Sequence, residues 1–146
     1  MSVDTDARGT LFALALRLVR SAPNAEFIVR QVSGMSRDVA APEDLRRAVI
    51  RCASRLLRGR HASEAQVRAA EVRRYTAEVT RLMPDTDPAV ERAIASLPDR
   101  TRCILVLRDI ESYTPAEITG LLGVSEKTVR QRIREARRLV RYQLES

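Results

Sequence analysis

Apolar residues recur at intervals of three and four along most of this chain, which is the period of a helix with one buried face. Alternation of the strand type never extends beyond a few residues. The pattern therefore predicts an all-α protein. In the first half it predicts helices at residues 11–20, 25–35 and 43–59, followed by an Ala-rich helical stretch within 61–83.

The connections between these helices are predicted from turn-forming residues. Ser21–Asn24 contains proline and asparagine and is expected to form a turn, and Ser36–Pro42 is expected to form a loop. In the second helix, the candidates for the core are Phe27, Ile28 and Val32.

A candidate domain boundary lies at Met83–Pro88, where two prolines and two aspartates fall within six residues. We therefore expect two small helical domains: residues 8–83, a bundle with a helical connector, and residues 88–146. Four helical segments are expected in the second domain. The first two are predicted at 88–96, with Asp87 as N-cap, and at 100–109.

The last two segments carry the strongest local signals. Thr114, Pro115 and Glu117 have the spacing of a capping box with proline at the first helical position. Gly123 falls where a left-handed residue would end that helix, and Ser125 is placed to cap the next one. A short helix, a turn with glycine and a capped second helix are the layout of a helix-turn-helix.

The second helix of this motif has two distinct faces. Its core face is predicted to contain Val129, Ile133, Ala136 and Val140. The outward residues are Glu126, Lys127, Arg130, Gln131, Arg134, Arg137, Arg138 and Arg141. Arginine pairs with guanine and glutamine with adenine in the major groove. The alternative is a solvated amphipathic helix with an ordinary run of charges, but the caps, the glycine and the one-sided basic face together favour DNA binding.

The charge distribution agrees with this interpretation. The chain has 26 basic and 19 acidic residues, a net charge of +7, which favours a polyanionic partner such as nucleic acid or an anionic membrane. Residues 126–144 alone contain seven basic and two acidic side chains. The basic surplus is therefore concentrated on the last helix.

Other functional classes are not supported by the sequence. No signal peptide and no membrane-spanning run is recognised, so we expect a cytoplasmic protein without a membrane partner. Cys52 and Cys103 are expected to be small buried residues, and His61 a surface residue. No metal-ligand spacing, nucleophile constellation or phosphate-binding loop is present. We expect no enzymatic activity, metal or cofactor.

The C-terminal segment resembles region 4, the promoter-recognition domain, of extracytoplasmic-function sigma factors. The matching elements are Leu97-Pro98, Arg102, Leu107-Arg108, Ala116-Glu117-Ile118, Leu122-Gly123-Val124-Ser125, Thr128-Val129 and Arg137 to Leu139. Lys127 replaces a glycine that is common in the family. The resemblance implies that Lys127, Arg130, Gln131 and Arg134 meet bases or backbone of the −35 element and that Thr128, Arg132 and Arg138 contact phosphates. With the capping Ser125, these residues form the expected DNA-binding set.

The N-terminal half resembles region 2 of the same family, which binds the polymerase and opens the −10 element. The matching elements are the segment Leu11 to Leu18, Ala25-Glu26, Leu45-Arg46, Arg51 and Ala53. The chain departs from the family at several positions. Phe27 replaces a residue that is usually acidic, and Arg30-Gln31 replaces a usual Gln-Glu pair. Ala48 replaces a tryptophan, Arg55 replaces an asparagine, and the loop Ser36–Pro42 is several residues shorter than usual. A plain three-helix bundle is the alternative for this half.

The resemblance implies a sigma-factor-like transcription factor that binds double-stranded promoter DNA and contacts core RNA polymerase. An anti-sigma factor or another regulatory protein is a further expected partner. Two alternatives remain: a sigma-derived regulator or protein-partner module that does not melt promoters, and a dimeric helix-turn-helix repressor or activator.

Overall fold

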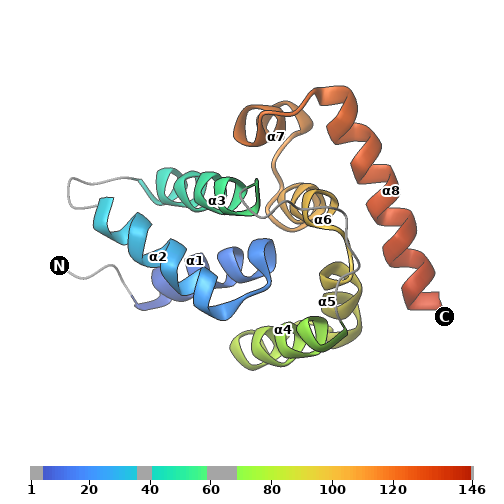
Figure 1. The fold of residues 1–146 in the computed structure, drawn as a ribbon, viewed down its shortest axis with the longest axis horizontal. Coiled ribbons are helices and arrows are strands. Elements are labelled where there is room, and N and C mark those ends of the chain that lie inside the picture. The colour runs from blue at the N-terminus through green and yellow to red at the C-terminus, as the bar shows by residue number, and fades with distance from the viewer. Residues whose placement is uncertain (1–4, 36–40, 59–68, 146) are drawn as a thin grey trace.

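The computed structural model describes residues 5–35, 41–58 and 69–145, and every regular element within these ranges is helical (Figure 1). The all-α prediction is confirmed. The helices are α1 (Thr5–Val19), α2 (Ala22–Met35), α3 (Pro42–Arg58), α4 (Ala69–Leu82), α5 (Pro88–Ala95), α6 (Asp99–Leu105), a π-helical turn η2 (Val106–Ile110), α7 (Pro115–Leu122) and α8 (Glu126–Glu145).

Helix α1 is the centre of the N-terminal half, and it contacts α2, α3, α4 and α6. Helix α6 packs against α8, and α4 packs against α5 across the segment 83–88. The buried apolar residues of both halves form one continuous cluster, from Leu14 of α1 through Ile104 of α6 to Val129 of α8. The two halves therefore share a core, and the domain extents 8–83 and 88–146 stay a prediction.

Helix α2 begins earlier than its sequence pattern indicated. The predicted turn Ser21–Asn24 is reduced to Arg20 and Ser21, and Ala22 is already helical. Proline is compatible with the first helical turn, so Pro23 does not delay the helix. The hydroxyl of Ser21 accepts a hydrogen bond from the backbone N–H of Asn24 at 3.3 Å. This bond satisfies one of the free N–H groups at the helix start.

The prediction that Phe27 belongs to the core is wrong. Its side chain is 53% exposed, whereas Ala25, Ile28 and Val32 are completely buried. Residues 25, 28 and 32 follow the spacing of three and four that defines one helix face. Phe27 lies about 100° away from Ile28 around the helix axis, on the solvent side.

The periodicity predicted a single helix over residues 100–109, but this segment is not one continuous α-helix. Helix α6 ends at Leu105, and η2 adds a wider turn in which the N–H of Glu111 bonds the carbonyl of Val106 at 3.0 Å. The backbone then turns at Ser112, whose φ is +65°. π-Helical turns such as η2 are common at functional positions, and η2 is the last helical element before α7.

Both cysteines are free thiols. Cys103 is buried, and burial raises the pKa of its thiol to about 11, whereas Cys52 is half-buried against the core. The predictions for His61, for residues 61–68 and for loop residues 36–40 fall on parts of the chain outside the described residues. In the described part, no helix is long and apolar enough to cross a membrane. The same part contains no cluster of His, Cys, Asp and Glu able to hold a metal ion.

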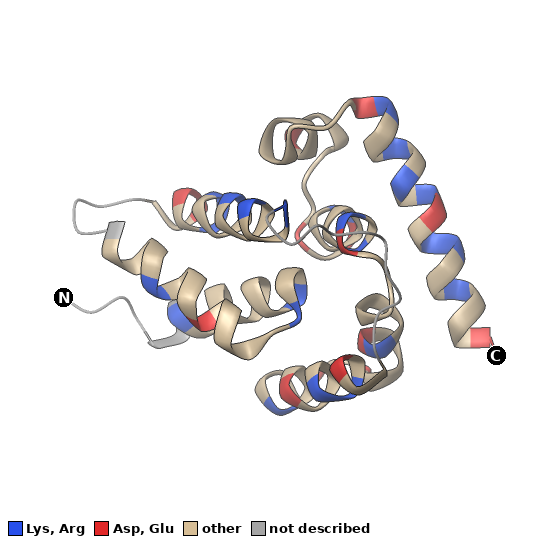
Figure 2. Cartoon of the chain, in the orientation of Figure 1, with Lys and Arg blue, Asp and Glu red and all other residues tan. Residues whose placement is uncertain are grey.

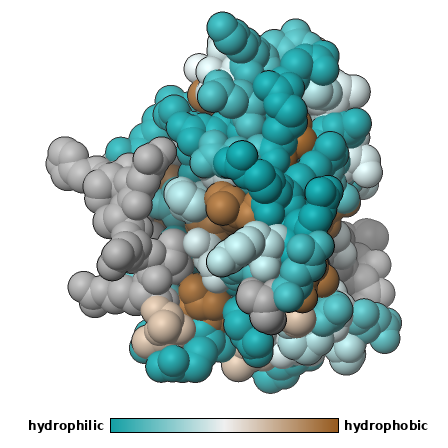
Figure 3. Space-filling view, turned by 90° about the vertical axis from the view of Figure 1, so that its right-hand side faces the viewer, coloured by the Kyte–Doolittle hydropathy of each residue, from teal (hydrophilic) through white to brown (hydrophobic). Residues whose placement is uncertain are grey.

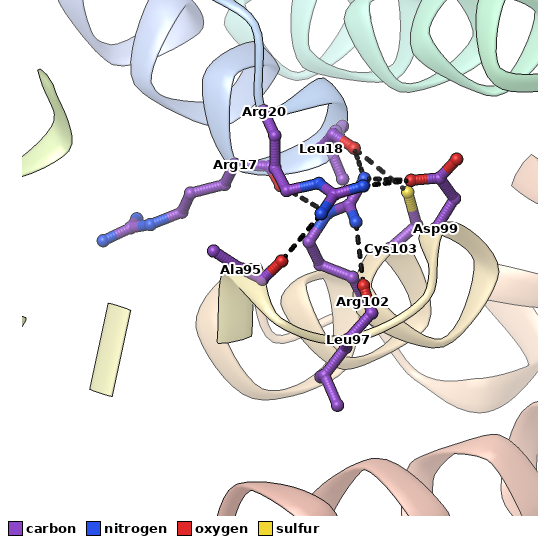
Figure 4. Close-up of polar contacts among 8 residues, drawn as sticks. All are labelled: Arg17, Leu18, Arg20, Ala95, Leu97, Asp99, Arg102 and Cys103. Carbon is purple, nitrogen blue, oxygen red and sulfur yellow. Dashed lines mark hydrogen bonds and ion pairs between the residues drawn. The ribbon is translucent and has the colours of Figure 1, made fainter. Parts of the chain in front are cut away.

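A buried ionic cluster, formed by the side chains of Arg20, Asp99 and Arg102, joins the two halves (Figure 4). The Arg102 guanidinium is completely buried. It donates to the carbonyls of Leu18 at 2.7 Å and Arg17 at 3.2 Å. These carbonyls belong to the last turn of α1, where backbone acceptors have no partner within the helix. Arg102 of α6 thus caps the C-terminus of α1.

The same guanidinium also binds within its own half, to the Leu97 carbonyl at 3.0 Å and to Asp99 at 2.8 Å. Arg20, with φ of +57°, donates to Asp99 at 2.9 Å. Burial by itself would raise the pKa of Asp99, but the adjacent Arg102 and Arg20 outweigh it, and the net pKa is lowered. Asp99 is therefore a carboxylate shared by two arginines, one from each half.

Candidate nucleic-acid interface

The start of α7 has the predicted capping box. The hydroxyl of Thr114 accepts a hydrogen bond from the N–H of Glu117 at 3.1 Å, and the Glu117 carboxylate accepts one from the N–H of Thr114 at 2.9 Å. Hydrogen bonding to Thr114, above all the bond from its backbone N–H to the carboxylate, lowers the pKa of Glu117. Pro115 occupies the first helical position. Two free donors are thereby satisfied, which fixes where α7 begins.

Gly123 ends α7 in the left-handed conformation that the sequence predicted, with φ of +70° and ψ of +31°. Its N–H donates to the carbonyl of Thr119 at 2.9 Å. A Cβ added at this glycine would meet only the Arg58 guanidinium, at 3.8 Å, which is an ordinary contact. The need for glycine is therefore conformational and does not come from lack of space.

Replacing Gly123 by valine is expected to lower the free energy of unfolding by about 1–3 kcal/mol, because a β-branched residue resists positive φ. Chemical denaturation followed by circular dichroism measures the loss. Gly120→Ala is the matched control: Gly120 lies inside α7 with open space around it, so alanine should stabilise by about 0.5–1 kcal/mol. Equal stability of the Gly123→Val variant and the wild type would contradict the role of this turn.

Ser125 caps α8, as predicted. Its hydroxyl accepts a hydrogen bond from the N–H of Thr128 at 3.1 Å and lies 2.8 Å from the Thr128 hydroxyl. Val124, just before it, packs against the core between the two helices. The N-terminus of α8 is thus fixed by its own side chains and presents its first exposed turn at a defined angle.

The two faces of α8 are as predicted. Val129, Ile133 and Ala136 are buried, and Val140 is half-buried. The predicted DNA-binding residues that lie exposed are Ser125, Lys127, Arg130, Gln131, Arg134 and Arg138. Basic residues follow one another along the whole helix (Figure 2), and the side of the molecule on which α8 lies has a mainly hydrophilic surface with smaller apolar areas between (Figure 3).

Two residues of the expected set are less accessible. Thr128 and Arg132 are half-buried. One guanidinium nitrogen of Arg132 lies 3.3 Å from the Glu135 carboxylate. Arg130 is exposed but paired with Glu126 at 2.7 Å, one helical turn earlier. An exposed pair of this kind contributes little to stability, so Arg130 can exchange Glu126 for another partner at small cost.

Arg137 has a structural partner that the helical pattern did not reveal. Its guanidinium binds both oxygens of the Asp109 carboxylate, at 2.6 and 3.0 Å. The hydrogen bonds to Asp109 raise the pKa of Arg137. This bidentate pair fastens α8 to η2. In the described part of the chain, no hydrogen bond or ion pair is found for the side chains of Lys127, Arg134 and Arg138, which leaves their charge available.

Sequence reasoning did not identify the contribution of α3 to this motif. Arg58 donates to the carbonyl of Leu122 at 3.0 Å, beside the turn at Gly123. Tyr113, just before α7, donates a hydrogen bond to the Glu43 carboxylate at 2.8 Å. Burial is the main cause that raises the pKa of Tyr113 to about 12, and this hydrogen bond is the second cause. Arg46 binds Glu111 at 2.8 Å. Helix α3 thus supports both ends of α7, through residues 64–70 positions apart in the sequence.

Comparison with known proteins agrees with this geometry. The family model described as sigma-70, region 4, matches residues 88–140, from the first residue of α5 to the last third of α8. SigM of Mycobacterium tuberculosis, an extracytoplasmic-function RNA polymerase sigma factor known from two strains, is 36% identical over 102 residues. That alignment covers 68% of this chain and 50% of SigM.

Comparison of the fold with solved structures also points to a sigma factor. The crystal structure of the extracytoplasmic-function sigma factor SigJ of Mycobacterium tuberculosis matches 92% of this chain and 50% of its own, with a TM-score of 0.64 and 26% identity. The chain thus spans about half the length of these relatives. Residues 88–140 thus match region 4 of the sigma-70 family, and the chain is similar in sequence to SigM and in fold to SigJ, both extracytoplasmic-function sigma factors.

Proposed function

We propose that this sigma-factor-like, DNA-binding transcription regulator recognises a −35-type promoter element with the exposed face of α8. The observation that carries the proposal is the capped helix-turn-helix, in which the Arg-rich face of α8 is exposed and its apolar face is buried. A helix of this form fits the major groove of duplex DNA.

The residue roles follow from exposure and charge. Lys127, Arg130, Gln131 and Arg134 are exposed on the first turns of α8 and are proposed to meet bases or the adjacent backbone. Phosphate contacts are proposed for Thr128, Arg132 and Arg138, with Ser125 at the helix start. Phosphate contacts position a protein on the duplex, and base contacts make it sequence-specific.

Core RNA polymerase is the proposed protein partner, and an anti-sigma factor is a second one. The support is the similarity to two named proteins. SigM is named an extracytoplasmic-function RNA polymerase sigma factor, and SigJ is named an extracytoplasmic-function sigma factor. Selection of sites from random duplex DNA tests the DNA function, and co-purification with core polymerase tests the partner. Failure to enrich any sequence would overturn the first, and failure to retain polymerase would overturn the second.

A second candidate function is a sigma-derived regulator that binds promoters without opening them efficiently. The residues at the positions of the family's region 2 support it: Phe27 is exposed where an acidic residue is expected, Ala48 stands in place of a tryptophan, and Arg55 in place of an asparagine. The chain contains no tryptophan at all. Capturing an unstacked base needs an aromatic platform or a shaped pocket, and unstacking costs a few kcal/mol.

With core polymerase and a promoter selected by this protein, we expect only weak permanganate reactivity of thymines near the start site. A well-characterised sigma factor with its own promoter, under the same conditions, is the control for polymerase activity. Protection of the −35 element in the same sample shows that binding itself is intact. Strong thymine reactivity without a second factor would show that the N-terminal half opens promoters and would reject this second candidate.

A further inference from the structure

A cavity of about 220 Å³ lies between α3, the start of α6 and the turn that links α7 to α8. Its apolar wall comes from three parts of the chain and includes Ile50, Ala53, Leu57, Cys103, Leu122 and Val124. Arg58, which also lines it, bonds the Leu122 carbonyl at 3.0 Å. The cavity therefore lies where the N-terminal half meets the helix-turn-helix. Junctions of this kind are frequent ligand sites.

The size of the cavity limits its occupant to a small molecule. An aliphatic cavity of about 150 Å³ is known to hold one benzene ring. A volume of about 220 Å³ accommodates roughly nine non-hydrogen atoms by the same proportion. The apolar wall offers few hydrogen-bonding partners, and a stable water cluster needs several for each molecule. An apolar body is thus the chemical match for the interior.

The rim of the cavity carries a net positive charge. Asp99 lines it, but its carboxylate already binds Arg20 at 2.9 Å and Arg102 at 2.8 Å. Within the described residues, Arg58 binds neutral acceptors alone, the Ser54 hydroxyl and the Leu122 carbonyl. Arg100 is exposed, and the described part of the chain provides no carboxylate for it. Two guanidinium groups at the rim are therefore free to bind an anionic head group.

We propose that this cavity is a binding site for a small amphiphilic carboxylate, with its apolar body against the wall and its carboxylate at Arg58 and Arg100. A medium-chain fatty acid with ten non-hydrogen atoms represents the class. The ligand would contact α3 and the turn before α8 at once, and would stabilise their junction. None of the lining residues belongs to the proposed DNA-binding set, so the test of this site needs no DNA.

Octanoate is the probe, with octanol and octylammonium as neutral and cationic controls of equal chain length. Calorimetry on the full chain should show saturable binding of octanoate at one site, with a Kd below about 1 mM, as expected for a ligand of this size. Both controls should bind at least tenfold more weakly. Equal affinity for the three probes, or no saturation by octanoate, would overturn the proposal.

Substitutions separate the rim from the wall. Arg100→Gln should weaken octanoate at least tenfold and leave octanol unchanged, while Ser54→Leu should fill the cavity and abolish both. Arg92→Gln, at an exposed arginine of α5 outside the cavity, is the matched control and should change nothing. Methyl NOEs from octanoate to Val124 would locate the ligand in the unmodified chain. NOEs only to methyls outside the cavity, or an unchanged affinity in Arg100→Gln, would contradict the site.

Discussion

Replacing Arg102 by methionine is expected to lower the free energy of unfolding by about 3–5 kcal/mol, because one member of a buried ionic network is lost and its partners remain. The carbonyls of Arg17 and Leu18 at the end of α1, and that of Leu97, would lose their donor inside the protein. Each buried acceptor without a partner costs about 1–3 kcal/mol. Methionine fills a similar volume, so the effect reports the lost polar contacts rather than a cavity.

Urea denaturation monitored by circular dichroism measures this loss. Arg92→Met is the matched control, because Arg92 is exposed on α5 and its substitution should change stability by less than about 0.5 kcal/mol. Arg102→Lys should lie between the two, since lysine keeps the charge but cannot reach several carbonyls with one planar group. A loss below about 1 kcal/mol for Arg102→Met would mean that the cluster does not hold the halves together.

The double substitution Arg130→Gln with Arg134→Gln is expected to weaken binding of the selected DNA site by about 2–6 kcal/mol, since each good base contact contributes about 1–3 kcal/mol. This range corresponds to a roughly thirty-fold to twenty-thousand-fold rise in Kd. Both side chains are exposed, and the Arg130–Glu126 pair offsets little of the effect because it is itself exposed. Binding to a scrambled duplex should change much less.

Fluorescence anisotropy titrations at several salt concentrations measure both effects. Arg138→Gln is the comparison variant, because a lost phosphate contact should weaken all sequences alike and reduce the salt slope by about one. Circular dichroism should show an unchanged fold for both proteins, since neither Arg134 nor Arg138 has a partner in the described part of the chain. Unchanged affinity of the double variant for the selected site would reject α8 as the recognition helix.

Local sequence determined the helix-turn-helix. The capping box of Thr114 and Glu117, the left-handed Gly123 and the Ser125 cap all join residues no more than four positions apart. Interactions over such short separations form in almost any tertiary context, because they depend on backbone angles and side-chain types alone. The buried face of α8 was predictable for the same reason, since helical period assigns its residues to one side.

Tertiary structure alone decided which charged and aromatic residues have structural roles. Arg102 is one of 25 arginines in the sequence, and its partners at the end of α1 lie 84 and 85 positions away. Neither the Asp109–Arg137 pair nor the Tyr113–Glu43 hydrogen bond follows from a local pattern. Whether an arginine binds DNA, caps a distant helix or lines a cavity depends on which elements pack beside it. That packing arises from contacts between segments far apart in the chain, which helical periodicity does not encode.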